Sequence, residues 1–128
     1  LTGKRILLVD DIDINRMIIS ELLIEAGAEV DEATNGQEAL QAFLQKGEGY
    51  YSLILMDIQM PLLNGYEATR ELRKLDAPSA QTIPVVAMTA HAFSDDVKLI
   101  LDAGMNGHIA KPFEIDQVNR ELAIPMST

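Results

Sequence analysis

Residues 53–61 read Leu53-Ile54-Leu55-Met56-Asp57-Ile58-Gln59-Met60-Pro61, an apolar run that ends in one carboxylate and is stopped by a proline. Successive aliphatic residues are typical of a strand buried on both faces, as in a parallel sheet. Other apolar runs of the chain also end in polar groups: Asp10-Asp11, Thr89 and Lys111. Because parallel strands end along one edge of an open sheet, where such folds place their sites, we expect these groups to lie together.

The composition indicates one compact globular domain of 128 residues, with 48% hydrophobic and 23% charged residues. A net charge of −10 argues against nucleic acid or a membrane surface as a direct partner. The chain has no cysteine, which excludes disulfides and thiolate chemistry. With no signal peptide and no apolar run long enough to span a bilayer, we expect a cytoplasmic location. The missing initiator methionine suggests a piece excised from a longer chain, whose parent could be a membrane-bound sensor with this domain on the cytoplasmic side.

Strand and helix patterns alternate along the whole chain. Short aliphatic runs predict strands at Arg5–Val9, Glu29–Ala33, Leu53–Met56, Pro84–Met88 and Gly107–Ala110. Helical patterns are expected at about Asp13–Ala26, Gly36–Lys46, Asn64–Leu75, Ser94–Ala103 and Glu114–Ala123. Asp13 is a candidate helix cap, and the segment from Asp76 to Thr82 reads as a linker. This alternation predicts an α/β domain, a parallel sheet covered by helices on both faces.

Five pieces of the chain resemble the receiver (response regulator) domain of two-component signalling: Leu7–Asp11, Ala33–Leu40, Met56–Pro61 with Gly65, Met88–Ala90, and Lys111-Pro112. They follow the family's order and span nearly the whole chain, 1–128. The resemblance implies a flavodoxin-like, doubly wound (βα)5 fold with strand order 2-1-3-4-5. Residues 13–16, 66–70 and 103–108 look most like receivers of hybrid sensor histidine kinases. A free-standing response regulator is the alternative.

The acids suit a metal-assisted phosphoryl transfer. A divalent cation held by Asp10 and Asp11 would bridge to Asp57 and to the phosphoryl oxygens, removing the repulsion between two anions. Hard oxygen ligands with room for water favour Mg²⁺, with Mn²⁺ as a substitute. The resemblance implies that the backbone carbonyl of Gln59 is a further ligand. It also implies that a phosphohistidine phosphorylates Asp57, so that the domain accepts a phosphoryl group and loses it slowly, without being an enzyme in the ordinary sense.

Lys111 offers a compact positive charge to the phosphoryl oxygens, and Thr89 offers a hydroxyl donor. Each of these residues also has a plainer interpretation. Asp10 and Asp11 could be helix-capping and turn residues, Asp57 could form a turn, and Lys111 could be a solvated lysine.

Switching is expected to come from the phosphate drawing Thr89 inward, with the small Ala90 leaving space for the loop. His108 stands where many receivers have an aromatic switch residue, so it either acts through charge or a hydrogen bond or is a surface histidine without a special role. By resemblance, Gln59 and His91 flank the phosphoryl group and tune the attack of water on it. The alternative is that both are solvated loop side chains.

The helix expected at Asp13–Ala26 is apolar around more of its circumference than one core-facing stripe: Ile14, Met17, Ile18, Ile19, Leu22, Leu23 and Ile24. We expect about two-thirds of these side chains to be buried and the rest to form an interface. The resemblance implies docking of a histidine-bearing four-helix bundle, of a kinase or a phosphotransfer domain. The alternative is a helix buried on two sides.

Other functional classes fit less well. A receiver-like interaction module without phosphorylation would be favoured by a lost acid or lysine, and none is lost. A small metal-dependent phosphohydrolase is suggested by Asp11-Ile12-Asp13, but it would use a nucleophile at the first strand and usually a cap domain. A flavin carrier would need donors after the first strand, where Asp10, Asp11 and Asp13 would repel a phosphate.

Overall fold

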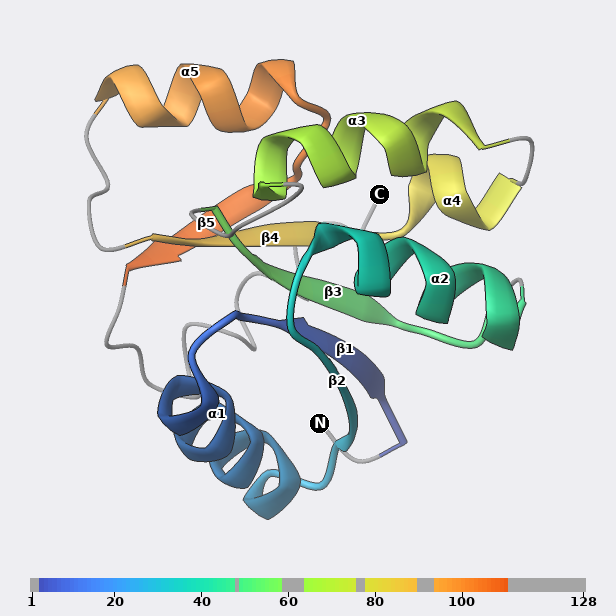
Figure 1. Ribbon diagram of the computed structural model, residues 1–128, viewed down its shortest axis with the longest axis vertical. Coiled ribbons are helices and arrows are strands. Elements are labelled where there is room, and N and C mark those ends of the chain that lie inside the picture. The colour runs from blue at the N-terminus through green and yellow to red at the C-terminus, as the bar shows by residue number, and fades with distance from the viewer. Residues whose placement is uncertain (1–2, 48, 59–63, 76–77, 90–93, 111–128) are drawn as a thin grey trace.

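The computed structural model describes residues 3–47, 49–58, 64–75, 78–89 and 94–110, with the backbone alone at 89, 94–97 and 110. Within these ranges the elements are β1 (Arg5–Val9), α1 (Asp13–Glu25), β2 (Glu29–Ala33), α2 (Gly36–Lys46), β3 (Leu53–Asp57), α3 (Gly65–Lys74), α4 (Pro78–Thr82), β4 (Val85–Thr89), α5 (Ser94–Asp102) and β5 (Gly107–Ala110) (Figure 1). The helix predicted at Glu114–Ala123 lies outside the described residues. None of the helices in the described ranges is long and apolar enough to cross a membrane.

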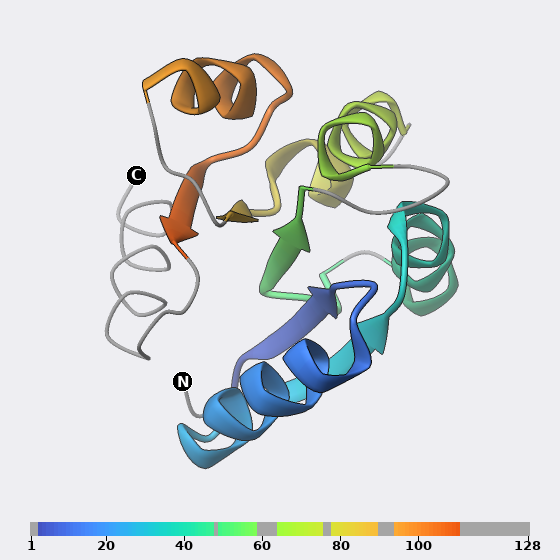
Figure 2. The ribbon, with the colours of Figure 1, turned by 60° about the vertical axis from the view of Figure 1, so that its left-hand side comes forward.

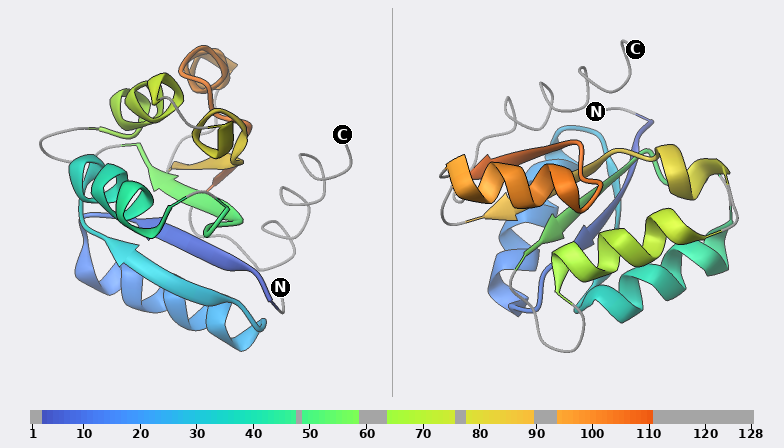
Figure 3. Two further views of the ribbon diagram at one scale, coloured as in Figure 1. Left: turned by 90° about the vertical axis from the view of Figure 1, so that its right-hand side faces the viewer. Right: turned by 90° about the horizontal axis from the view of Figure 1, so that it is seen from above.

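The strands form one sheet in the order β2-β1-β3-β4-β5, and every neighbouring pair is parallel. The predicted order 2-1-3-4-5 is therefore confirmed. α1 covers one face of the sheet, whereas α2, α3 and α5 cover the other (Figure 2). Figure 3 shows α2 and α3 side by side along that second face. Because the chain passes from β1 out to β2 and returns across β1 to β3, the direction of winding reverses between β1 and β3.

The central strands β1, β3 and β4 are buried on both faces, as their continuous aliphatic runs predict, whereas only Ala33 of β2 is buried. Alternate side chains of β1 and β3 enter different clusters: Ile6, Leu8, Leu53 and Leu55 on the side of α1, and Leu7, Val9, Ile54 and Met56 on the side of α2 and α3. From α1, Ile19 and Leu23 pack into the first cluster, and from α2, Phe43 packs into the second. Burial of each such side chain stabilises the fold by about 1.5–3 kcal/mol. The packed sheet therefore holds the residues at the ends of its strands in fixed positions.

The linker interpretation of the segment from Asp76 to Thr82 is wrong for its second part, which forms the short helix α4. Proline and small residues in this segment hide the signal, because they are typical of loops. Two hydrogen bonds stabilise α4 although its sequence gives a weak helix signal. The Thr82 hydroxyl donates to the Pro78 carbonyl (3.0 Å), and an Arg73 guanidinium N–H donates to the Ala80 carbonyl (3.1 Å). The side chain of Ala80 is fully buried.

The cap expected at Asp13 is also wrong. Ile12 is the N-cap residue of α1, without a side-chain capping bond, and Asp13 is the first helical residue. Asp13 is paired instead with the guanidinium of Arg16, three residues later in the same helix. A carboxylate in the first turn still interacts favourably with the helix dipole, so the residue type suits the position for a different reason.

Candidate functional site at the carboxyl edge of the sheet

Three carboxylates meet where β1 and β3 end. Asp10 and Asp11 follow β1, Asp57 is the last residue of β3, and carboxylate oxygens of all three lie within 4.8 Å of one another. The register explains the meeting, because Val9 pairs with Met56 and the next residue on each of these parallel strands is an aspartate. Asp10 and Asp57 are buried, with 0% and 7% of their surface exposed, whereas Asp11 is exposed.

This cluster has the chemistry of a site for a hard cation. Three negative groups at this separation repel one another, and a divalent cation removes that repulsion. Carboxylate oxygens are the ligands that Mg²⁺ prefers, and the exposed side of Asp11 leaves access for the waters that Mg²⁺ retains. Among the described residues, no other group of acids and histidines meets this closely.

Asp10 is held from several directions. Its backbone N–H donates to the carbonyl of Ala33 at the end of β2 (3.1 Å), and its carboxylate accepts from the N–H of Ile12 (3.0 Å). Its own carbonyl accepts from a guanidinium N–H of Arg16 (2.8 Å). The sequence offers only a weak signal for the role of Arg16, namely an arginine three residues after Asp13, because its other contacts depend on the fold.

Gly65 brings α3 directly against the backbone of Asp57. A Cβ atom at position 65 would lie 2.4 Å from the carbonyl oxygen of Asp57 and 3.0 Å from the Cα of Ile58. The N–H of Gly65 donates to the carbonyl of Ile58 (3.0 Å), and the Thr69 hydroxyl donates to the carbonyl of Gly65 (2.8 Å). Only glycine fits this approach, which supports the backbone that carries Asp57.

A capping box fixes the start of the same helix. The side chain of Asn64 accepts from the N–H of Glu67 (2.9 Å), and the Glu67 carboxylate accepts from the N–H of Asn64 (3.3 Å). The capping box therefore fixes the first turn of α3, the turn that begins with Gly65.

The remaining candidates are placed only in part. Thr89 is the last residue of β4 and pairs with Ala110 of β5. Since Asp57 pairs with Met88, the residue before Thr89, Thr89 lies at the same edge of the sheet as Asp57. The side chain of Thr89 and the whole of Gln59, Ala90, His91 and Lys111 lie outside the described part of the chain. Their roles stay predictions.

His108 lies on β5 opposite Ala87 and is half-buried. Its neighbour Ile109 enters the cluster on the side of α1, so alternation along the strand places His108 on the opposite face, with Ala87. Whether it acts as a switch residue stays a prediction.

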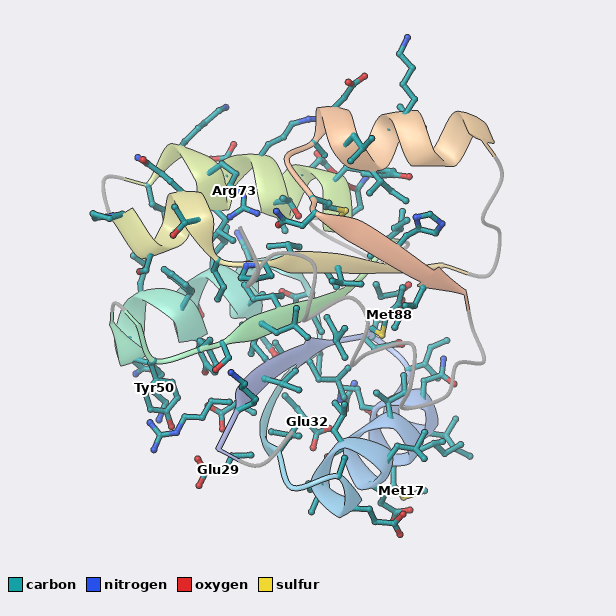
Figure 4. The ribbon with its side chains drawn as sticks, turned by 180° about the vertical axis from the view of Figure 1, so that it is seen from behind. Met17, Glu29, Glu32, Tyr50, Arg73 and Met88 are labelled. Carbon is teal, nitrogen blue, oxygen red and sulfur yellow. The ribbon has the colours of Figure 1, made fainter. Side chains whose placement is uncertain are left out.

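The outer side of α1 is more exposed than the sequence suggests. Only Ile19 and Leu23 among its large apolar side chains are buried, so the expectation that two-thirds would be buried is wrong. We define the α1 patch as Ile14, Met17, Ile18 and Ile24, which are 51–59% exposed. Figure 4 shows Met17 on the side of α1 that faces away from the sheet. Its first residue, Ile14, lies in the first turn of α1, which follows Asp10 and Asp11 in the chain.

Comparison with known proteins decides the family. The model of the response regulator receiver domain matches residues 6–123. This chain belongs to that family. The receiver is 35% identical over 111 residues to hybrid signal transduction histidine kinase I of Dictyostelium discoideum, a match that covers 85% of the receiver and 6% of the relative. It spans only 6–13% of the length of the curated relatives that it matches, several of which are hybrid or sensor kinases.

Two solved structures resemble the receiver closely. One is the receiver domain of sensor histidine kinase PA1611 from Pseudomonas aeruginosa PAO1, with a magnesium ion coordinated in its active site cleft (TM-score 0.84, 35% identity, 99% of this chain and 100% of that one). The other is the Saccharomyces cerevisiae receiver domain of Ssk1 in complex with the histidine phosphotransfer protein Ypd1 (TM-score 0.81, 27% identity, 95% and 88%). Receivers are signalling domains, and the predicted family and fold are both confirmed.

Proposed function

We propose that the receiver takes a phosphoryl group from a phosphohistidine onto the carboxylate of Asp57, in a reaction that requires Mg²⁺. The observation that carries the proposal is the meeting of Asp10, Asp11 and Asp57 within 4.8 Å at the point where the winding of the sheet reverses. The magnesium ion in the similar receiver of PA1611 supports the choice of metal. Mn²⁺, which accepts the same ligands, is expected to substitute.

Each residue has a distinct part in the proposed reaction. Asp10, Asp11 and Asp57, with the backbone carbonyl of Gln59, hold the cation, which neutralises charge on the incoming phosphoryl oxygens when it is bound. An oxygen of Asp57 attacks phosphorus, and the bond from phosphorus to the histidine nitrogen of the donor breaks, leaving the donor as free histidine. Lys111 adds a positive charge beside the phosphoryl group.

The signal is proposed to leave the site through Thr89. Its hydroxyl hydrogen-bonds the new phosphoryl group, and the small Ala90 lets the loop follow. His108 is the proposed responding residue on β5, and Gln59 and His91 are proposed to control how fast water removes the phosphate. Slow self-catalysed dephosphorylation then resets the domain.

Intact mass measurement tests the acceptor function. Wild type, Asp57→Asn and Asp31→Asn are incubated with acetyl phosphate and Mg²⁺, with and without excess EDTA, and quenched rapidly. We expect one added phosphoryl group in wild type and in the Asp31→Asn control, and none with EDTA or in Asp57→Asn. No adduct in wild type would favour the interaction module, and an adduct in Asp57→Asn would assign the acceptor to another residue.

We further propose that the donor docks on the α1 patch and that the parent chain is a hybrid sensor histidine kinase, with this domain in the cytoplasm. Exposed apolar side chains beside the acid cluster support the docking surface. The complex of the Ssk1 receiver with Ypd1 supports a histidine phosphotransfer protein or kinase domain as the partner.

A charge in the α1 patch tests the docking. Ile18→Glu is compared with Leu44→Glu, a control on α2 whose native side chain is similarly exposed, at 59% against 51%. The expected result is slower transfer to Ile18→Glu from a phosphorylated histidine phosphotransfer domain, with normal phosphorylation by acetyl phosphate, which needs no docking. Equal transfer rates for the two variants would refute the α1 patch as the docking surface.

A further inference from the structure

Arg16 follows the acid pair Asp10-Asp11 in the chain, and its side chain is only 12% exposed. It lies on α1 and makes three separate contacts. One guanidinium N–H donates to the carbonyl of Asp10 (2.8 Å), a second donates to the carboxylate of Glu32 on β2 (3.2 Å), and a third is bonded to Asp13. A guanidinium has a rigid planar arrangement of donors, so three contacts in different directions fix its position.

The carbonyl that Arg16 holds belongs to the peptide between Asp10 and Asp11. Rotation of that peptide changes how the two carboxylates stand relative to each other. The N–H of Asp10 is already bonded to Ala33 on β2, and Arg16 is bonded to Glu32 on the same strand. The guanidinium of Arg16 on α1 therefore links β2 to the peptide between Asp10 and Asp11, the two proposed metal ligands.

The charge of Arg16 and its contacts would affect the metal in opposite directions. A positive charge near the cluster repels Mg²⁺, so a purely electrostatic role predicts tighter binding when that charge is removed. A positioning role predicts weaker binding, because the two carboxylates lose their fixed geometry. The sign of the change therefore separates the two roles.

We propose that Arg16 is a positioning residue that orients Asp10 and Asp11 for the cation. The inference rests on the proposed Mg²⁺ function. Lysine cannot replace Arg16 in this role, because one ammonium group cannot reach the Asp10 carbonyl, Asp13 and Glu32 in the planar arrangement of a guanidinium.

The test compares Arg16→Lys and Arg16→Met with Arg5→Lys and Arg5→Met by calorimetric titration with Mg²⁺. Arg5 is a matched control, since its guanidinium also pairs with a glutamate of β2, Glu29 (2.7 Å), but at the opposite end of that strand. We expect both Arg16 variants to bind Mg²⁺ about tenfold more weakly than wild type, as is typical when a group that orients a metal ligand is lost. Both Arg5 variants should bind as wild type does.

Amide hydrogen exchange without metal gives a second readout, in which the Arg16 variants should exchange faster at residues 10–12 while melting cooperatively. Wild-type affinity in Arg16→Lys, or tighter binding in Arg16→Met, would overturn the inference and leave a role through charge. If Arg16→Met does not fold, Arg16→Lys decides. A wild-type chain that binds no Mg²⁺ at all would instead refute the proposed function.

Discussion

The two edges of the sheet differ in how their charged side chains are arranged. At the carboxyl edge, three carboxylates gather within 4.8 Å, two of them buried. Toward the amino edge, charged groups meet complementary partners: Arg5 pairs with Glu29, and Arg73 bonds carbonyl oxygens. Among the described residues, the carboxyl edge thus brings three acids together beside the ion-paired Arg16, an arrangement that a cation can use, whereas the contacts named at the amino edge serve stability. Functional sites commonly depart in this way from the rules that stabilise the rest of a fold.

The amino edge also carries an aromatic cluster. The Arg5 guanidinium lies 4.5 Å from the centre of the Tyr50 ring, which meets Tyr51 edge to face with ring centres 4.9 Å apart. The Tyr51 hydroxyl donates to the carboxylate of Asp31 (2.7 Å), and burial together with this bond raises the pKa of Tyr51 above its usual value. Glu29 and Tyr50, both labelled in Figure 4, each contact the guanidinium of Arg5. Every named group here has a partner within the protein.

The largest expected effect on stability is at the amino edge. Arg73 donates twice to the Gly104 carbonyl (3.0 and 2.9 Å), and also to the Ala80 carbonyl (3.1 Å) and the Asn106 side chain (2.9 Å). Arg73→Met should lower the free energy of unfolding in urea by about 3 kcal/mol, because bonds to a charged donor are lost. The folded variant should still accept a phosphoryl group at the wild-type rate. Slower acceptance by folded protein would mean that the two edges are coupled.

Gly65→Ala breaks the carboxyl edge itself. Alanine normally favours a helix over glycine, but here its Cβ would lie 2.4 Å from the Asp57 carbonyl oxygen, so we expect a loss of about 2 kcal/mol. Acceptance at Asp57 should slow as well. Gly47→Ala is the control, since position 47 has φ of 88° but no atom near its Cβ, and should cost only about 1 kcal/mol. A stabilised Gly65→Ala would show that α3 moves away at no cost.

Asp11→Asn should change stability in the other direction. Removing one of three crowded carboxylates relieves repulsion, so the metal-free variant should be more stable than wild type by about 0.5–1 kcal/mol. Mg²⁺ should raise the melting temperature of wild type much more than that of Asp11→Asn, because the variant has lost a proposed ligand. Equal shifts with Mg²⁺ would remove Asp11 from the ligand set.

The smallest effect is expected for Glu29→Gln at the amino edge. The ion pair with Arg5 joins side chains that are 69% and 46% exposed, so solvent and salt weaken it. The melting temperature should fall by no more than about 2 °C, less so in high salt, with Mg²⁺ affinity unchanged. Loss of a carboxylate is thus expected to lower stability at the amino edge and to raise it at the carboxyl edge. A Glu29→Gln variant that is more stable than wild type would contradict this difference between the edges.

Much of the fold could be predicted because its signals are local. All five strands lie where they are expected, with β3 reaching one residue further, to Asp57, and β4 shifted by one to Val85–Thr89, although β2 (Glu29–Ala33) carries three acids and has the weakest apolar signal. The helix α4 could not be predicted, since Arg73 and buried Ala80 stabilise it from outside the segment. The exposure of the α1 patch was also underestimated, because an apolar helix gives no indication of how much of it the sheet covers.

That Asp10, Asp11 and Asp57 share one edge could be predicted in the same way, from parallel strands and the positions at which they end. That β1 lies directly beside β3 followed only from the family resemblance. Arg16 and Gly65 could not be given roles. The contacts of Arg16 join α1 to β2 and to the Asp10 backbone, and the fit of Gly65 depends on how closely α3 approaches β3. Both depend on distances between elements, which a pattern of residues does not contain.

The most direct test of the central claim locates the phosphoryl group by chemical trapping. Borohydride reduces an acyl phosphate on aspartate to homoserine, so the receiver is treated with acetyl phosphate and Mg²⁺, reduced, digested and sequenced by mass spectrometry. We predict homoserine at position 57 alone, and none when Mg²⁺ is removed. Homoserine at Asp10 or Asp11, or trapping that is independent of Mg²⁺, would contradict the assignment of Asp57 as the metal-dependent acceptor.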